Sequence, residues 1–393
     1  MIQKLKNIYH FIRALSANYW YGFPSRKLQV IGVTGTDGKT TTTHLIYHVL
    51  SSAGKKVSMI STIFAKIGRE EYDTGFHVTT PDATLIPRYM KMARDQGQEY
   101  FVLETTSHRL DQNQLAGIQF EVAVITNITH EHLDYHRTID EYAQTKMKLI
   151  QMAKVGIVNA DDEVTQKTIS NLKFKILNLK TYGLTNKASY SIDFRKDIPN
   201  LADFNAYNYL AAYAVCRELG LTDKEIRTAC STFILPAGRI DIVYNKKFMV
   251  IVDFAHTPNA IECILQTIRK QYVHGKGRLI HVFGSAGLRD RTKRFAMGKA
   301  SATFADISYI TEEDYRTEDP QKIADEIGLG FGNKQYFVEL NREKAIHAAL
   351  DEAKPNDIVV VTGKGHEKSL CRGRSEYPWS DKNCIQSYVH LLS

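Results

Sequence analysis

The chain has 393 residues, a formal net charge of +8 and a hydrophobic share of 43%, so it is long enough for two or three domains with substantial cores. The positive balance suits an enzyme that acts on phosphates and carboxylates. No interleaved basic and aromatic pattern accompanies it, so we expect no nucleic-acid partner. The five cysteines form no CxxC pair, which fits a reducing compartment, the cytoplasm.

The N-terminal segment is basic and amphipathic. Three basic residues are spaced among apolar ones over residues 1–17, a pattern too polar for a signal peptide or a bilayer span. We expect a helix that packs on its own protein; contact with a membrane surface or a partner is the alternative. Gly22 and Pro24 then predict a connector over residues 18–27.

Short apolar runs alternate with helical patterns along most of the chain. They predict buried strands at residues 28–33, 56–60, 100–104 and 122–126, and again at 248–253, 278–283, 306–311 and 357–362. A helix over residues 40–53 is closed by Gly54. This alternation is typical of parallel sheets covered by helices on both faces. We therefore expect an α/β fold with an N-terminal helix and connector (1–27), a central domain (28–236) and a C-terminal Rossmann-like α/β domain (237–393).

A glycine-rich loop follows the first strand and reads Gly35, Thr36, Asp37, Gly38, Lys39, Thr40, Thr41. Its glycines let backbone N–H groups surround phosphates, Lys39 adds a positive charge, and the following helix adds its dipole. Thr40 offers a hydroxyl to Mg²⁺, and Glu104, at another strand's carboxyl end, offers a carboxylate. The spacing differs from the usual Walker A motif, but the order of strand, loop, Lys-Thr and helix predicts an ATP site. An ordinary strand-to-helix turn and a solvated strand-end acid are the alternatives.

Two further features carry possible chemistry. His130, His132 and His136 lack the HExxH zinc signature, so a single histidine beside phosphate-bound Mg²⁺ explains them better. In the helix beginning near Ile139, Lys146 falls on the apolar stripe. A buried, unpaired ammonium costs on the order of several kcal/mol, so Lys146 needs an acidic partner or a chemical change. Its position leaves a structural ion pair and a functional lysine equally open.

Together the motifs resemble the Mur ligase family and, within it, the UDP-N-acetylmuramoyl-tripeptide synthetase (MurE-type) branch. The resemblance runs from about residue 30 to residue 381. The matching segments are Gly35–Thr42, Ser61-Thr62, Thr79-Thr80-Pro81, Glu104–His108, Thr126-Asn127, His132–His136, Asn205, Asn208, Gly238-Arg239, Asp253–Pro258, Arg289-Asp290, Lys293-Arg294 and Gly363–Glu367. Their shared order is more specific than any one of them.

The resemblance implies an ADP-forming acid–amino-acid ligase of peptidoglycan precursor synthesis. ATP would phosphorylate the D-Glu carboxylate of a muramoyl-dipeptide acceptor, and the amine of a diamino acid would then displace phosphate. The resemblance also implies two Mg²⁺ ions held by Thr40, Glu104, His132 and a carbamylated Lys146. Lys39, Lys146 and His132 would be the catalytic residues.

The resemblance assigns binding roles to three groups of residues. ATP would be bound by Gly35, Thr36, Asp37, Gly38, Lys39, Thr40, Thr41, Asn205, Asn208, Arg239, Asp253 and His256. The acceptor would be bound by Ser61, Thr62, Thr79, Thr80, Ser107 and His108. The incoming amino acid would be bound by Arg289, Asp314, Arg316, Gly363, His366 and Glu367.

Three departures from the family pattern concern the substrates. Relatives carry a uridine-binding domain where this sequence has residues 1–27, and a substrate-binding arginine of the family reads Gln114 here. We therefore expect the acceptor to be held differently, by the N-terminal helix or a partner, or not to be a UDP-sugar. The selectivity motif Asp-Asn-Pro-Arg reads Glu313-Asp314-Tyr315-Arg316, which favours meso-diaminopimelate over L-lysine. A folylpolyglutamate-like ligase with a non-UDP acceptor and a noncatalytic nucleotide-binding protein are the alternatives.

Overall fold

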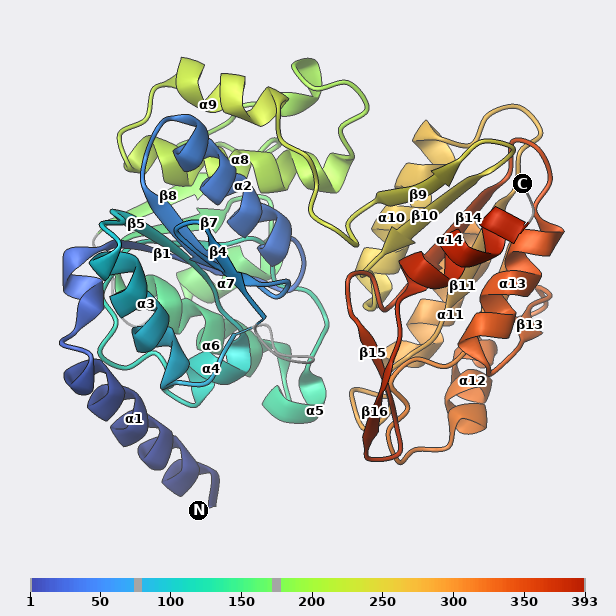
Figure 1. Cartoon of the computed structure of the whole chain (residues 1–393), viewed down its shortest axis with the longest axis horizontal. Coiled ribbons are helices and arrows are strands. Elements are labelled where there is room, and N and C mark those ends of the chain that lie inside the picture. The colour runs from blue at the N-terminus through green and yellow to red at the C-terminus, as the bar shows by residue number, and fades with distance from the viewer. Residues whose placement is uncertain (1, 74–79, 172–177, 392–393) are drawn as a thin grey trace. The chain divides into compact units, whose positions relative to one another are not determined.

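A computed structural model of the chain describes residues 2–73, 80–171 and 178–391. The chain forms two compact units, which are treated separately below (Figure 1). The first comprises residues 1–129 and 136–234, and the second comprises residues 130–135 and 235–393. The short helix α5 (Leu133–His136) spans the junction of the two ranges.

The first unit is built on an eight-stranded sheet. Its strands are β1 (Gln29–Thr34), β2 (Val57–Ile60), β3 (Ala65–Ile67), β4 (Glu70–Tyr72), β5 (Tyr100–Glu104), β6 (Phe120–Ile125), β7 (Ala153–Asn159) and β8 (Leu179–Tyr182). Its helices are α1 (Ile2–Trp20), η1 (Pro24–Lys27), α2 (Lys39–Ser52), α3 (Leu85–Asp95), α4 (Ser107–Asp111), α6 (Ile139–Gln151), α7 (Glu163–Ser170), η2 (Phe194–Lys196), α8 (Asp203–Glu218) and α9 (Asp223–Ser231).

The strand order in this sheet is β4-β3-β2-β5-β1-β6-β7-β8, and only the pairings of β3 are antiparallel. Alternate residues of β1 face opposite layers, as the period of a strand requires. Ile31 and Val33 pack with α2, α8 and α9, whereas Val30 packs with α3, α4 and α6. The carboxyl ends of β1, β2, β5 and β6 therefore share one edge of the sheet, where ligands gather in open parallel sheets.

The second unit contains a six-stranded sheet and a hairpin. Its strands are β9 (Asp241–Asn245), β10 (Met249–Asp253), β11 (Leu279–Phe283), β12 (Ile307–Ile310), β13 (Phe337–Val338), β14 (Ile358–Thr362), β15 (Ser369–Arg372) and β16 (Ser375–Pro378). Its helices are α10 (Pro258–Gln271), α11 (Lys293–Phe304), α12 (Pro320–Gly328), η3 (Leu329–Phe331), α13 (Arg342–Glu352) and α14 (Asp381–Leu391).

This sheet has the order β13-β12-β11-β14-β10-β9, with β9 antiparallel and the other pairings parallel. Helices α13 and α14 pack on one face, and Figure 1 shows α10 and α11 behind the other. The predicted α/β fold, with a parallel-rich sheet followed by a second α/β sheet, is confirmed. Each predicted strand is present within two residues of its expected bounds. The strands β3, β4, β7, β8, β9 and β13 and the β15–β16 hairpin were not predicted. Apart from β7, each has five residues or fewer and so leaves little periodicity in the sequence.

The N-terminal helix forms as expected but packs in an unexpected orientation. Helix α1 contacts its unit through small and polar residues such as Ala14 and Asn18, while its large apolar side chains are exposed. The expectation that this helix packs on its own protein is confirmed by the contacts of Asn7, Arg13 and Asn18, although its apolar side faces away from the unit. Within the described residues, no helix combines the length and hydropathy that a bilayer span requires.

Candidate functional site

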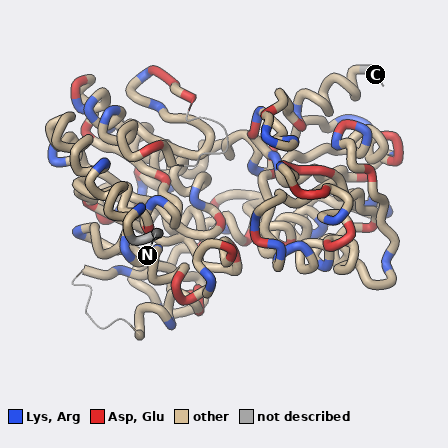
Figure 2. Tube along the Cα trace, turned by 90° about the horizontal axis from the view of Figure 1, so that it is seen from below, with Lys and Arg blue, Asp and Glu red and all other residues tan. Residues whose placement is uncertain are grey.

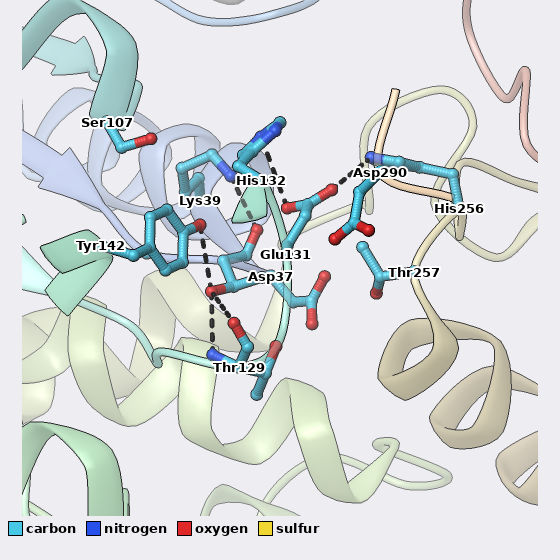
Figure 3. A network of polar contacts seen from close by, with 12 residues as sticks. Asp37, Lys39, Ser107, Thr129, Glu131, His132, Tyr142, His256, Thr257 and Asp290 are labelled. Atoms are coloured by element: carbon cyan, nitrogen blue, oxygen red, sulfur yellow. Dashed lines mark hydrogen bonds and ion pairs between the residues drawn. The ribbon is translucent and has the colours of Figure 1, made fainter. Parts of the chain in front are cut away.

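The phosphate loop joins β1 to α2. Gly35 and Gly38 have φ values of 151° and 80°, and a Cβ at Gly35 would meet the Thr126 hydroxyl at 1.7 Å. These two positions therefore require glycine. The Nζ of Lys39, in the first turn of α2, donates to the carbonyl of Thr36 at 2.7 Å, so its ammonium folds back over the loop (Figure 3). A positive charge and a helix N-terminus thus meet at one loop, an arrangement that binds phosphate.

Glu104 ends β5 beside this loop and is 0% exposed. Its Oε1 accepts hydrogen bonds from the hydroxyls of Thr40 (3.0 Å) and Thr62 (2.8 Å), and its Oε2 accepts one from the backbone N–H of Thr62 (2.9 Å). Carboxylate and hydroxyl oxygens are the ligands that Mg²⁺ prefers, so this group fits a magnesium site. Thr62 was expected to bind the acceptor, and here it shares Glu104 with Thr40.

Lys146 is 1% exposed and lies under the phosphate loop. Its Nζ donates to the carbonyl of Gly35 at 2.6 Å and lies 4.3 Å from the ring centroid of Tyr142. The Tyr142 hydroxyl lies 3.3 Å from the Thr36 hydroxyl (Figure 3). The Thr36 hydroxyl also accepts a hydrogen bond from the backbone N–H of Thr129. The lysine therefore contacts the loop that we expect to hold ATP.

Helix α6 can approach the sheet closely because Gly32 has no side chain. A Cβ at Gly32 would lie 2.9 Å from Leu149 of α6 and 3.0 Å from Phe120 of β6. Leu149 is one turn after Lys146 on the same helix. The contact at Gly32 therefore holds α6 where Lys146 reaches the loop.

Two buried asparagines of α8 lie beside the same loop. The Asn208 Nδ2 donates to Asn205 Oδ1 at 3.0 Å, and the Asn208 Oδ1 accepts from Thr42 at 3.5 Å. A Cβ at Gly38 would meet Asn208 Oδ1 at 2.1 Å, so the amide sits against the loop itself. Both amides can donate and accept, as recognition of an adenine edge requires.

The hydroxyls expected to bind the acceptor lie at the ends of β2 and β5. Ser61 Oγ lies 3.0 Å from His44 Nε2 and donates to the carbonyl of Phe64. Thr80 Oγ1 donates to the carbonyl of Glu104 at 3.0 Å. Thr79 lies outside the described residues.

Ser107 and His108 begin α4, next to His136. Ser107 Oγ is 2.9 Å from His136 Nε2, and the rings of His108 and His136 are 5.7 Å apart. Burial, and then the charge of His108, lower the pKa of His136 to about 4. The His136 imidazole is therefore neutral at neutral pH and positions the Ser107 hydroxyl.

Arg109 is a residue that the sequence analysis passed over. Its Nε donates to the carbonyl of Thr80 at 3.0 Å, and its Nη1 donates to Gln114 Oε1. Burial lowers the pKa of Arg109, although Asp82 opposes this. A guanidinium thus lies against Gln114, where the family pattern has an arginine. Its position directly after the matching segment Glu104–His108 was the available signal.

In the second unit, Asp253 ends β10. Its carboxylate accepts the backbone N–H groups of Ile240 and Ala255, both at 2.8 Å. Burial raises the pKa of Asp253, while Arg239 opposes the rise. The Arg239 guanidinium stacks 4.7 Å from the ring centroid of Phe254. A carboxylate and a guanidinium thus lie at one strand end, as the expected ribose-side site requires.

Glu131 pairs with two histidines (Figure 3). Its Oε1 lies 3.2 Å from His256 Nε2, and its Oε2 lies 3.6 Å from His132 Nε2. His256 Nδ1 donates to the carbonyl of Phe254, which leaves Nε2 for Glu131. Burial would raise the pKa of Glu131, but His132 and His256 hold it well below its usual range. His132 thus shares a buried carboxylate with His256, and its role as a metal ligand stays a prediction.

Lys364 is buried between two acids that were predicted to bind the amino acid. Its Nζ donates to Asp314 Oδ1 at 2.8 Å and pairs with the Glu367 carboxylate. Burial lowers the pKa of Lys364, but Glu367 and Asp314 together raise it above its ordinary value. Lys364 could not be assigned from the sequence, because a lysine in a Gly-Lys-Gly turn gives no sign of burial.

The remaining amino-acid candidates surround this ion pair. Arg316 donates from Nη1 to the carbonyl of Gly287 at 2.9 Å. The neighbouring Glu313 is buried, its Oε2 has no hydrogen-bond partner among the described residues, and it lies 3.1 Å from the position of a Cβ at Gly363. Arg289 is exposed, and the His366 ring lies 5.0 Å from that of Phe254. Glu313 therefore presents the carboxylate oxygen that an incoming ammonium would need.

Residues 33–216 match the Mur ligase middle domain, and residues 238–365 match the Mur ligase, glutamate ligase domain. The UDP-N-acetylmuramoyl-L-alanyl-D-glutamate–2,6-diaminopimelate ligase of Aquifex aeolicus is 38% identical over 95% of this chain and 80% of its own length. The corresponding ligase of Geobacillus thermodenitrificans is 36% identical over 96% and 82%.

Solved structures give the same picture of the fold. A structure of a UDP-N-acetylmuramoyl-L-alanyl-D-glutamate–2,6-diaminopimelate ligase superposes with a TM-score of 0.59, at 30% identity over 93% of this chain and 79% of that one. A Mycobacterium tuberculosis folylpolyglutamate synthase, complexed with ADP and AMPPCP, has a TM-score of 0.69 at 17% identity, over 90% and 92%. The chain therefore belongs to the Mur ligase family, whose members are ATP-dependent ligases that form amide bonds.

Proposed function

We propose that the chain joins a diamino acid to a muramoyl-dipeptide acceptor during cytoplasmic synthesis of peptidoglycan precursors. The names of its relatives point to UDP-N-acetylmuramoyl-L-alanyl-D-glutamate and 2,6-diaminopimelate as the class of substrates. The observation that carries the proposal is the group of Thr40, Thr62 and Glu104 beside Lys39. It places oxygen ligands and a positive charge at one strand edge.

The reaction needs two displacements. An acceptor carboxylate oxygen attacks the γ-phosphorus of ATP, the bond to ADP breaks, and an acyl phosphate forms. The amine of the diamino acid then attacks the acyl carbon, phosphate leaves with the bonding electrons, and the amine loses a proton. Lys39 would balance negative charge on the transferring phosphoryl group, which is the main catalytic demand of phosphoryl transfer.

The donor set fits Mg²⁺ rather than a softer metal. Thr40, Thr62 and Glu104 offer only oxygen ligands, and Glu104 would contribute the formal negative charge. A bound Mg²⁺ would supply neutralising charge to the phosphate oxygens. Thr40 and Thr62 orient the Glu104 carboxylate by hydrogen bonds, so the chain holds it ready before a metal binds.

We assign a carbamate to Lys146. The amine is buried beside the loop, and its hydrogen bond to the carbonyl of Gly35 uses an N–H that a carbamate nitrogen would keep. Reaction with CO₂ forms an N–C bond and releases two protons from the ammonium, so the cation becomes an anion with two further oxygens. These oxygens would suit a second Mg²⁺.

We propose that Arg109 binds an anionic group of the acceptor. It is held by Thr80 and Gln114, next to the Ser107 and His136 pair. A guanidinium binds carboxylate or phosphate through paired donors. Arg109 would therefore replace the arginine that the family pattern has at position 114.

Charge pattern favours meso-diaminopimelate as the amino acid. Glu313 offers a buried carboxylate oxygen to an ammonium, and Arg316 offers a guanidinium to a second carboxylate. L-Lysine has no second carboxylate and would leave Arg316 without an ionic partner.

Mass spectrometry of the products tests the whole proposal. The chain, with ATP and Mg²⁺, is given the UDP-linked muramoyl-dipeptide or the same dipeptide without UDP, each with meso-diaminopimelate or L-lysine. We expect the tripeptide, ADP and phosphate with meso-diaminopimelate, and no product with Lys39→Ala. Product from the UDP-free acceptor alone would show that uridine is not recognised. Absence of any amide product from the wild-type chain would refute the ligase assignment.

A further inference from the structure

Helix α1 turns its large apolar side chains away from the protein. Leu5, Ile8, Ile12, Leu15 and Tyr19 follow one another at spacings of three and four residues, and each is 39–77% exposed. With Trp20 and the exposed Tyr9 and Phe11, they cover roughly 180° of the helix. An exposed apolar stripe of this size is characteristic of an interaction surface.

The opposite side of the helix is fixed to the first unit by polar contacts. The Asn7 Nδ2 donates to the carbonyl of Asp111 at 3.0 Å, and Arg13 pairs with Asp82 at 2.8 Å. Asn18 is buried and donates to the carbonyl of Ala116 at 2.9 Å. These contacts are made by the polar face, so the apolar face is held outward.

The N-terminal segment itself carries charge of one sign. Residues 1–27 contain Lys4, Lys6, Arg13, Arg26 and Lys27 and no Asp or Glu. Elsewhere, basic and acidic residues are interspersed along both units (Figure 2). Lys6, Arg26 and Lys27 are exposed. The partner of this surface should therefore be apolar with an anionic rim.

A second copy of the chain meets these requirements poorly. Two such helices would bring like charges together, because neither carries an acid to pair across the seam. The apolar arc is also wider than the narrow stripe that a two-helix seam buries. An anionic lipid surface satisfies both the charge and the width.

We propose that α1 docks the protein on an anionic membrane by lying in the lipid interface. Its apolar arc enters the boundary between headgroups and acyl chains, and Lys6 reaches outward to lipid phosphates. Tyr19 and Trp20 lie at the C-terminal end of the helix, and amphipathic aromatic rings favour the headgroup level. This docking goes beyond the proposed catalytic function and does not depend on it.

Vesicle co-sedimentation of the full chain tests the docking. The probes are vesicles of phosphatidylcholine alone and of phosphatidylcholine with about one-third phosphatidylglycerol. We expect binding to the anionic vesicles, a loss of roughly tenfold or more in the double variant Ile8→Gln with Ile12→Gln, and a loss of about tenfold in Lys6→Glu. Leu329→Gln is the matched control, because Leu329 is 71% exposed on the second unit and should not change binding.

The changed side chains are exposed, so the variants should have the same midpoint of urea unfolding as the wild type. A wild-type chain that stays in the supernatant with anionic vesicles, or a double variant that binds as well as wild type, overturns the proposal. Sedimentation velocity without lipid tests the alternative that a second copy of the chain covers this surface. A wild-type dimer that the double variant dissolves, without vesicle binding, would assign the surface to a second copy. The vesicle assay measures membrane binding and the ligase assay measures product formation. A negative result in the first therefore does not count against the proposed ligase function.

Discussion

Substituting Glu104→Gln removes one negative charge from the predicted magnesium site at almost constant size. Both carboxylate oxygens accept hydrogen bonds from Thr40 and Thr62, at 2.8–3.0 Å. The glutamine oxygen can face the Thr62 N–H while its NH₂ group faces the two hydroxyls, which rotate to accept. All three contacts then survive in neutral form, each weaker by roughly 1 kcal/mol. The cost of burying a charge, on the order of several kcal/mol, disappears. We expect the free energy of unfolding to stay within about 2 kcal/mol of wild type or to rise.

Activity should respond in the opposite way. The carboxylate is the group we expect to hold charge opposite the triphosphate. Loss of one preorganised electrostatic group lowers kcat by roughly 10²- to 10³-fold, or about 2.7–4 kcal/mol of activation free energy. The Mg²⁺ concentration for half-maximal rate should also increase.

Phosphate release with acceptor and amino acid present, over a series of Mg²⁺ concentrations, measures this effect, and urea denaturation of the same samples measures stability. Glu99→Gln is the control, since Glu99 precedes β5 and is exposed. If Glu104→Gln kept activity within about threefold of wild type, Glu104 would not belong to the metal site. A loss of activity matched by an equal loss of folded protein would also contradict the reasoning.

Other substitutions probe the remaining assignments. Lys146→Ala should lower phosphate release by roughly 10²-fold, and a short carboxylic acid should restore part of it if the native group is a carbamate. Arg109→Ala should raise the acceptor KM with little change in kcat, and adding Gln114→Arg should reverse this in steady-state kinetics. Burial lowers the pKa of His281 to about 3, so the unfolded chain takes up a proton near pH 6.5 and the folded chain does not. Stability is therefore lost as the pH falls, by about 2 kcal/mol between pH 7 and pH 5, and His281→Gln should flatten the urea profile in this range. Lys364→Met leaves the buried Asp314 and the partly buried Glu367 without their cation and should cost roughly 3–5 kcal/mol, measured as a lower urea midpoint.

Specific results would contradict the first three of these predictions. An acid that fails to restore any activity to Lys146→Ala argues against the carbamate. An acceptor KM that Arg109→Ala leaves unchanged removes Arg109 from the acceptor site. Parallel pH profiles for wild type and His281→Gln would mean that another group causes the acid sensitivity.

The sequence predicted well what short-range pattern controls. The strand before Gly35 and the helix after Lys39 follow from apolar runs and glycine punctuation, and their observed bounds differ by about one residue. Lys146 was singled out because one helical period places it on the buried face. The antiparallel strands β3, β4 and β9 were not foreseen, because short, half-buried strands leave little periodicity.

The sequence did not predict which side chains contact residues that are distant along the chain. Nothing in the local pattern connects Lys364 with Asp314, 50 residues earlier, or Arg109 with the carbonyl of Thr80, 29 residues earlier. The sequence also made no prediction of the orientation of α1, for a related reason. An amphipathic pattern identifies an apolar face, but the tertiary contacts of Asn7, Arg13 and Asn18 decide which face points inward.

The absence of a side chain at Gly32 limits which residues this position can accept. Because Gly32 has no side chain, β1 and α6 lie in close contact there. Phe120 and Leu149 already fill the space that one methyl group would need. Gly32→Ala would lift α6 by a fraction of an ångström and carry Lys146 with it. The residue at position 32 of the strand therefore sets the distance between Lys146 and the loop carbonyl of Gly35, three positions further along the chain.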